Sequence, residues 1–250
     1  FTANTGGTSR AFEITSAKIE GSESIYEQDP VNGSGLTYLF RQDGAGDASN
    51  NTGFFFLFKQ GQMQLRDFTV DTATTNYVES IDALNINESD VWLYKLDEFG
   101  QIFETWTKVP SLSGNNAVYN SLAENQRNIY NVVTKENDSI DLVFGDGNFS
   151  NLPLGSFRSY YRVSDNAQYA IQPGEMANVQ IAVPYTDRNG AQQTLTVTMS
   201  LQASVYNSAA TESNDSIREK AGQVYYSQNR MITAEDYQVV PLSASQEIIK

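Results

Sequence analysis

The fold of this chain is constrained most by short segments in which apolar and polar residues alternate between turn-forming residues. The clearest segment is Thr194–Leu201, where Thr or Ser alternates with Leu, Val and Met. Alternation with a period of two places the apolar side chains on one face of a β-strand. Only six prolines in 250 residues, with abundant Asn, Ser, Thr and Gly, are typical of strands joined by polar turns. The sequence therefore predicts a mainly β chain.

Strand-like patterns recur along the first 200 residues. They lie at Ala11–Glu20, Leu36–Phe40, Gly53–Phe58, Met63–Val70, Val91–Leu96, Gln101–Val109, Ile129–Val133, Ser139–Phe144, Ala177–Val183 and Thr194–Leu201. Three pairs of these segments flank short turns, at residues 97–100, 135–138 and 187–190, and predict hairpins.

Two segments carry more specific predictions. The aromatic run Gly53–Phe58, bounded by turn residues, predicts a strand buried on both faces. Between residues 69 and 90, the spacing of Tyr77, Ile81 and Leu84 indicates a short helix.

From about Ala209 the pattern becomes helical. Ser216 and Glu219 have the spacing of a capping box, in which Ser caps free backbone amides and Glu reaches back. The apolar residues Ile217, Ala221, Val224 and Tyr225 form one stripe. Thr233 is expected to cap a second helix, which Pro241 ends.

The predicted fold class is α+β, mainly β, with an antiparallel β-rich body and a short C-terminal helical segment. The expected divisions are residues 1–165 (β-rich body), 166–208 (strand-hairpin segment) and 209–250 (helical segment with a truncated end). The chain lacks an initiating Met and a signal-peptide pattern, so we expect a fragment or a processed product.

The composition excludes several kinds of chemistry. The chain has neither histidine nor cysteine, which removes imidazole bases, thiolate nucleophiles, disulfides and the usual zinc ligands. Its net charge of −14 and scattered Lys and Arg argue against nucleic acid and anionic membranes as partners. Carboxylate chemistry, oxygen-ligated Ca²⁺ or Mg²⁺ and non-catalytic roles stay open.

Phe144-Gly145-Asp146-Gly147 is the most conspicuous motif. A strand that runs into Gly-Asp-Gly predicts a tight turn, in which Gly supplies a positive φ and Asp bonds its own backbone. A Ca²⁺ loop or a catalytic Asp146 is the functional alternative, although the EF-hand pattern is absent. The Gly- and Asp-rich segment Asp43–Asp47 lacks the Lys of a phosphate-binding loop and predicts a connecting loop.

Two stretches together resemble a known family. Ile140–Arg162 combines Phe-Gly-Asp-Gly, Pro153-x-Gly155 and a final Tyr-Arg, and Ser216–Tyr237 combines an Ile-Arg-x-x-Ala helix with Arg-x-x-Thr-x-x-Asp-Tyr. Both are similar, in order and separation, to blocks of the baseplate J-like family, the baseplate wedge proteins of T4-like contractile-tailed phages. Ser150 is a departure, because Gly is often found there. The early end of the chain would make it a C-terminal fragment.

The resemblance implies a structural virion protein rather than an enzyme, with no catalytic residue, no cofactor and no metal. Its implied partners are itself, in homodimer and ring contacts, and other baseplate wedge and sheath-initiating proteins, with no nucleic acid, membrane or small-molecule substrate. It implies assembly in the host bacterial cytoplasm into the tail baseplate. The motif residues that it singles out are Phe144, Gly145, Asp146, Gly147, Ile217, Arg218, Arg230, Thr233, Asp236 and Tyr237.

Two alternatives of other classes stay open. The first is a β-sandwich carbohydrate-binding or adhesin module, in which Trp92 and Trp106 could belong to a sugar-stacking platform. The second is a glycosidase that works with two carboxylates and no histidine. With 30 acidic residues, the sequence nominates no particular pair.

Overall fold

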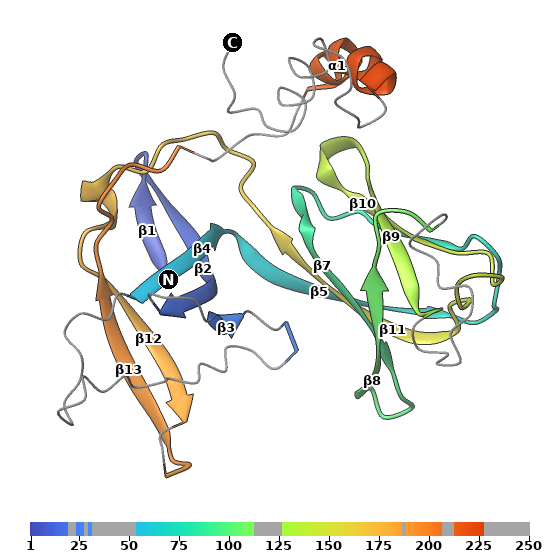
Figure 1. The fold of residues 1–250 in the computed structure, drawn as a ribbon, viewed down its shortest axis with the longest axis horizontal. Coiled ribbons are helices and arrows are strands. Elements are labelled where there is room, and N and C mark those ends of the chain that lie inside the picture. Colours follow the sequence, from blue (N-terminus) through green and yellow to red (C-terminus); the bar gives the residue numbers. More distant parts are fainter. Residues whose placement is uncertain are drawn as a thin grey trace.

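The computed structural model describes residues 1–19, 24–27, 30–31, 54–112, 127–186, 189–206 and 213–227 (Figure 1). In this part of the chain, strands dominate and one α-helix follows them late in the sequence. The predicted fold class is therefore confirmed. Nearly all strand pairs are antiparallel, and β8 and β9 form a parallel pair.

The first sheet is built around one long strand. Its members are β1 (Thr2–Thr5), β2 (Thr8–Ile19), β3 (Ser24–Glu27) and β4 (Phe54–Gln60). Strand β2 pairs antiparallel with each of the other three.

The second sheet has seven strands in the order β5-β11-β7-β8-β9-β10-β6. They are β5 (Gln62–Val70), β6 (Val78–Ile81), β7 (Ile86–Leu96), β8 (Ile102–Lys108), β9 (Ile129–Thr134), β10 (Ile140–Phe144) and β11 (Gly155–Val163). A short 3-10 turn, Glu136–Asp138, joins β9 to β10.

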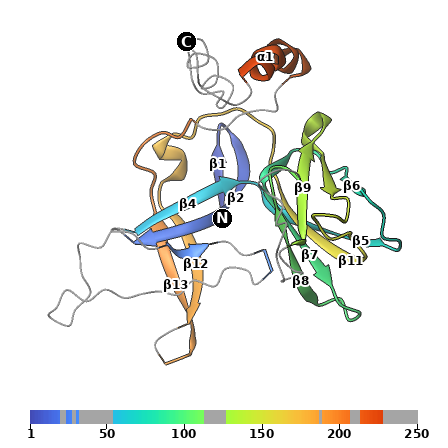
Figure 2. The same cartoon turned by 45° about the vertical axis from the view of Figure 1, so that its right-hand side comes forward.

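This second sheet curls around one apolar core (Figure 2). Phe144, Phe157 and Trp106 form its aromatic centre, with ring centroids 5.3–6.1 Å apart. The outer strands β5 and β6 meet through an ion pair, in which Arg66 Nη2 lies 3.1 Å from Glu79 Oε1. The sheet is therefore an open barrel whose seam is held by side chains.

The later part of the chain returns to the first sheet. It forms a 3-10 turn (Pro173–Met176) and the hairpin of β12 (Val179–Thr186) and β13 (Gln192–Met199). Helix α1 (Asn214–Ser227) follows later in the chain. Ile171 and Met176 pack with Ala3 and Phe12 in a second apolar core. Residues far apart in the sequence thus share one core, while the boundaries expected at residues 165 and 208 stay predictions.

The chain passes between the sheets at two adjacent points. Only Gly61 separates β4 from β5, and Gln62 pairs with Val163, the last residue of β11 (Figure 1). Gly61 has a φ of +115°, and a Cβ there would lie 2.4 Å from the Val163 carbonyl oxygen. A glycine is required because both the backbone angle and the close strand approach exclude a side chain.

Most predicted strands and all three hairpins are confirmed. The helix indicated between residues 69 and 90 is wrong, because Val78–Ile81 pairs with β10. Within this region Asn76 and Asn85 have φ of +54° and +58°, and an α-helix contains no residue with a positive φ. The prediction that the 53–58 strand is buried on both faces is wrong at Leu57, which is 56% exposed.

The helix start also differs from the prediction. Ser213, three residues before the expected cap, accepts a hydrogen bond on its Oγ from the Ser216 amide (3.2 Å) and so caps α1. The strand at Leu36–Phe40, the loop Asp43–Asp47 and the second helix with Thr233 lie outside the described residues.

Candidate functional site

Four charged side chains meet at the junction of the two sheets. Arg162 of β11 donates from Nε to Asp90 of β7 (2.8 Å) and from Nη1 to Glu13 of β2 (2.5 Å). Lys59 of β4 donates from Nζ to the other Asp90 oxygen (2.7 Å). We call Glu13, Lys59, Asp90 and Arg162 the junction cluster; each sheet supplies one acid and one base, so the formal charges cancel.

Burial makes this cluster different from a surface ion pair. The Arg162 side chain is fully buried and that of Asp90 is 9% exposed, while Glu13 and Lys59 reach solvent. Burial acts to raise the pKa of Asp90, but hydrogen bonds from Lys59 and Arg162 outweigh it, so the pKa lies below its ordinary value. A buried charge is tolerated only when it is paired and hydrogen-bonded in this way.

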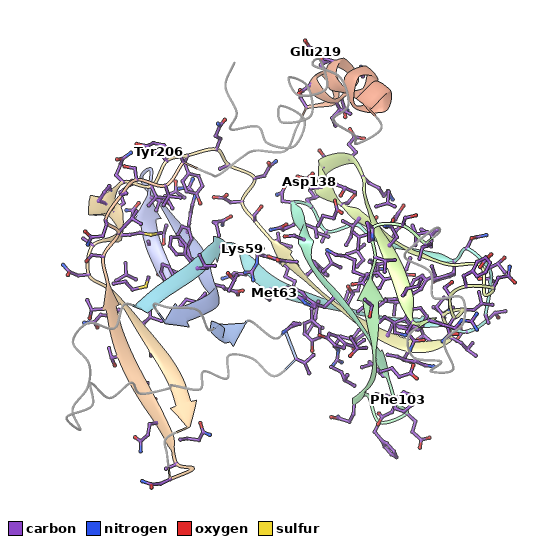
Figure 3. The ribbon with its side chains drawn as sticks, in the orientation of Figure 1. Lys59, Met63, Phe103, Asp138, Tyr206 and Glu219 are labelled. Atoms are coloured by element: carbon purple, nitrogen blue, oxygen red, sulfur yellow. The ribbon has the colours of Figure 1, made fainter. Side chains whose placement is uncertain are left out.

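The junction cluster is also braced by the backbone. Glu13 Oε1 accepts a hydrogen bond from the Met63 amide (3.2 Å), just beyond the Gly61 crossing. A side chain adds to this contact, because Lys59 Nζ also donates a hydrogen bond to Ser89 Oγ (3.3 Å). Figure 3 shows Lys59 and Met63 between the two sheets. Charged and backbone contacts therefore fix the two sheets relative to each other at the point where the chain crosses.

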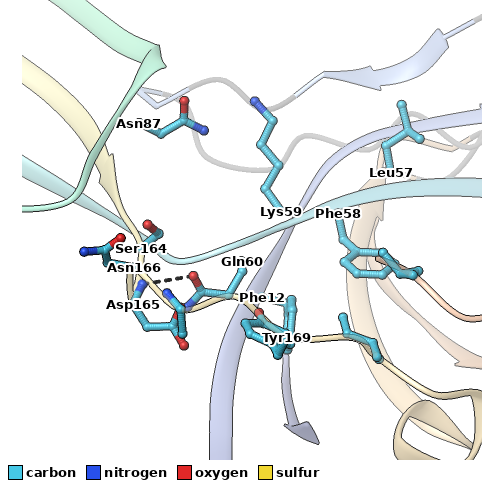
Figure 4. A pocket seen from close by; sticks show the side chains of 13 residues that line it. Phe12, Leu57, Phe58, Lys59, Gln60, Asn87, Ser164, Asp165, Asn166 and Tyr169 are labelled. Carbon is cyan, nitrogen blue, oxygen red and sulfur yellow. Dashed lines mark hydrogen bonds between the residues drawn. The ribbon is translucent and has the colours of Figure 1, made fainter. Parts of the chain in front are cut away.

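A pocket of about 490 Å³ opens beside the junction cluster (Figure 4). Phe12, Phe58 and Tyr169 contribute aromatic rings to its lining, and Gln60 and Asp165 contribute polar groups. Residues of both sheets and of the segment after β11 therefore face one space.

The outer face of the second sheet, opposite its core, carries a row of large side chains. Tyr160 of β11 stands opposite Leu65 of β5 on one side and Trp92 of β7 on the other. In the next row, Arg158 stands opposite Tyr94, whose ring lies 5.9 Å from that of Tyr160.

Leu65 is 55% exposed, and Phe103, on the same face of β8, is 64% exposed (Figure 3). Residues 65, 92, 103, 158 and 160 are called the outer aromatic face; Tyr94 lies in the same rows but is only 9% exposed. Trp106 does not belong to it, because it is buried in the core at 4% exposure.

The Phe-Gly-Asp-Gly motif forms the predicted tight turn. Phe144 is fully buried in the core, and Gly147 has a φ of +85°. Asp146 is partly exposed and accepts hydrogen bonds from the Asn148 side chain and backbone (both 2.9 Å), which lower its pKa. Among the described residues, no group of three acidic side chains is placed to hold a metal ion.

Two further contacts shape this turn. Arg127 donates from Nη2 to the carbonyl oxygens of Gly147 (3.0 Å) and Asn148 (2.7 Å). A Cβ on Gly145 would lie 1.7 Å from Ser150 Oγ, which is buried and has no hydrogen-bond partner in the described part of the chain. Ser150 therefore occupies the space directly against Gly145.

The other motif residues are placed only in part. Ile217 lies on α1 and is 46% exposed, and Arg218 contacts Asp215 on the same helix (3.4 Å). Arg230, Thr233, Asp236 and Tyr237 lie outside the described residues. The packing of Ile217 with Tyr237 stays a prediction.

Sequence reasoning did not single out the junction cluster. Arg162 ends the Tyr-Arg pair of the first block, but Glu13, Lys59 and Asp90 stand alone in their segments. The position of Arg162 at the end of an alternating segment was a sequence signal for the cluster, but the sequence does not identify the residues that pair with it.

The fold is that of a mainly β protein. The segment that forms the curled seven-stranded sheet lies in the sequence between the strands of the first sheet and the residues that return to pack on that sheet. Residues 1–204 match the model of the family described as Domain of unknown function (DUF8360), and the chain belongs to this family. The match includes both sheets and the β12–β13 hairpin and ends before α1. No curated protein and no solved structure matches the chain. No helix of the described residues is long and apolar enough to cross a membrane.

Proposed function

We propose that this chain is a structural virion protein, a baseplate wedge subunit of a T4-like contractile-tailed phage. It would dimerise and link wedges into the baseplate ring, with other wedge proteins and the sheath-initiating protein as further partners. The proposal includes no catalytic step and no cofactor. Its sequence support is the resemblance of Ile140–Arg162 and Ser216–Tyr237 to the baseplate J-like family.

Strand β11 is the observation that carries the proposal. It belongs to the first resembling block, presents Arg158 and Tyr160 on the outer aromatic face, and sends Arg162 into the junction cluster. Aromatic residues and Arg are enriched at protein–protein interfaces, and a rigid sheet loses little entropy when it binds. We therefore infer that the outer aromatic face is the surface through which two copies meet.

Light scattering on the full chain tests this interface. We expect a dimer, and we expect Leu65→Asp to produce monomers because it buries a charge in the contact. Leu84→Asp is the matched control, since Leu84 is also 55% exposed but lies in the connection between β6 and β7 rather than among the residues of this face. A wild-type chain that stays monomeric at high micromolar concentration would contradict self-association. Cross-linking in virions that yields no contact with tail proteins would contradict the wedge assignment.

A carbohydrate-binding or adhesin module is the second candidate. One observation favours it, namely that Trp92 and Tyr160 stand side by side on a partly exposed sheet face. Binding on a glycan array that disappears with Trp92→Ala would support this function. If the protein binds no glycan on the array and forms a dimer that Leu65→Asp disrupts, this second candidate is contradicted and the wedge proposal stands.

A further inference from the structure

We propose that the junction pocket is a binding site for a neutral, hydroxyl-rich ring compound, of the size of one or two sugar units. This pocket, the one beside the junction cluster described above (Figure 4), shares no lining residue with the outer aromatic face. The inference does not depend on the baseplate assignment.

The dimensions of the pocket suit a small molecule. Its volume of about 490 Å³ falls within the range of roughly 300–1,000 Å³ typical of ligand sites. Such sites combine a mostly apolar lining with a few placed polar groups. This space has both features, and residues from five separated segments of the chain build it.

The aromatic part of the lining is held in place before any ligand arrives. Phe58 and Tyr169 are partly exposed, and Phe12, which is only 2% exposed, supports Phe58 from behind, with ring centroids 5.7 Å apart and planes at 86°. The Arg10 guanidinium lies 4.0 Å from the Tyr169 ring centroid and fixes that ring. A rigid aromatic wall suits the apolar C–H face of a sugar ring at little entropic cost.

The charges at the rim are already paired, which selects a neutral ligand. Lys59 is held by Asp90 (2.7 Å), and Asp165 is held by Arg10 (2.5 Å). An anionic ligand would have to compete with Asp90 for Lys59, and a cationic ligand would compete with Arg10 for Asp165. A neutral ligand leaves both pairs intact.

Two polar groups are left for the ligand. Gln60 Oε1 accepts a hydrogen bond from the Asp165 amide (3.1 Å), which orients the side chain. Its Nε2 and the Ser164 hydroxyl have no hydrogen-bond partner among the described residues. A hydroxyl-rich ligand can accept from the first and exchange a hydrogen bond with the second, whereas an apolar ligand would leave both unpaired.

Saturation-transfer NMR on the full chain tests the proposal, with three methyl glycosides as probes: those of glucose, galactose and N-acetylglucosamine. We expect transfer to at least one of them. Ala167→Phe, which fills the pocket from its wall, should abolish the signal. Gln60→Ala should weaken binding about three- to tenfold, the value of one neutral hydrogen bond. Gln64→Ala, on the exposed surface of β5, is the matched control and should change nothing.

Each other outcome counts against the site. No transfer to any glycoside, or equal transfer in Ala167→Phe folded with the wild-type melting temperature, would overturn the proposal. Loss of binding in Trp92→Ala but not in Gln60→Ala would place the sugar on the outer aromatic face instead. Preference for a sialic acid glycoside over the neutral probes would refute the charge argument.

Discussion

Replacing Arg162 by Met tests whether the junction cluster stabilises the fold. Met keeps an unbranched aliphatic chain but removes the guanidinium. Glu13 then loses its ion pair with Arg162, and Asp90 keeps its ion pair with Lys59 and its weaker hydrogen bonds from Asn87 and Ser89. Removing one partner of a buried ion pair costs about 3–5 kcal/mol. Because Lys59 still compensates Asp90 and Glu13 is 29% exposed, we expect the low end, about 3 kcal/mol.

Differential scanning calorimetry measures this effect, and Arg158→Met supplies the control. In a chain of this size, about 3 kcal/mol corresponds to a fall of roughly 6–12 °C in the melting temperature. Arg158 lies on the same strand and also makes two hydrogen bonds to a carboxylate, Asp67 (both 2.7 Å), but at the surface. Exposed pairs contribute about 0–1 kcal/mol, so its loss should lower the melting temperature by at most about 4 °C. Equal falls for the two variants would refute the argument that burial at the junction makes the difference.

The folded-state pKa of Asp90 is lowered, so its stabilising contribution is complete above about pH 4 and is lost as the pH falls through the lower value; melting curves of Asp90→Asn should therefore depend less on pH below 4 than those of wild type. Gly145→Ala should destabilise the fold by about 1–3 kcal/mol in urea titrations, and Ser150→Gly in the same chain should recover most of that loss, because the two side chains would collide. Ser213→Ala should cost α1 about 1 kcal/mol, seen as faster amide hydrogen exchange in its first turn, and unchanged exchange would contradict the cap.

Local sequence patterns predicted the strands well because the alternation of a strand and the residues of a tight turn are both set within a few positions. The Thr194–Leu201 alternation and the 97–100 turn both encode structure within a few residues, and β13 and the β7–β8 hairpin confirm them. The 69–90 region misled because helix-like spacing there competes with pairing to β10, a partner some 60 residues away. Tertiary pairing of this kind overrides a local preference for helix.

The candidate site was less accessible from the sequence. Arg162 and Glu13 are 149 positions apart, and nothing near either residue names the other. A lone Arg in an alternating strand predicts a solvated side chain, because charged residues are rarely buried unless paired. The pocket depends on the same long-range arrangement. By contrast, the Gly-Asp-Gly turn was predictable because its hydrogen bonds lie within two residues of Asp146.

The pairing of Gln62 with Val163 has a mechanical consequence. A force that pulls on the chain before and after the seven-stranded sheet would act on Gln62, the first residue of that sheet, and on Val163, its last, and these two residues are paired with each other. The load would pass across the β5–β11 pair and bypass the remaining strands. Because Gln62 and Val163 lie at the same end of an antiparallel pair, this tension would open the β5–β11 ladder one residue pair at a time, starting at the chain crossing, rather than shear it along its length.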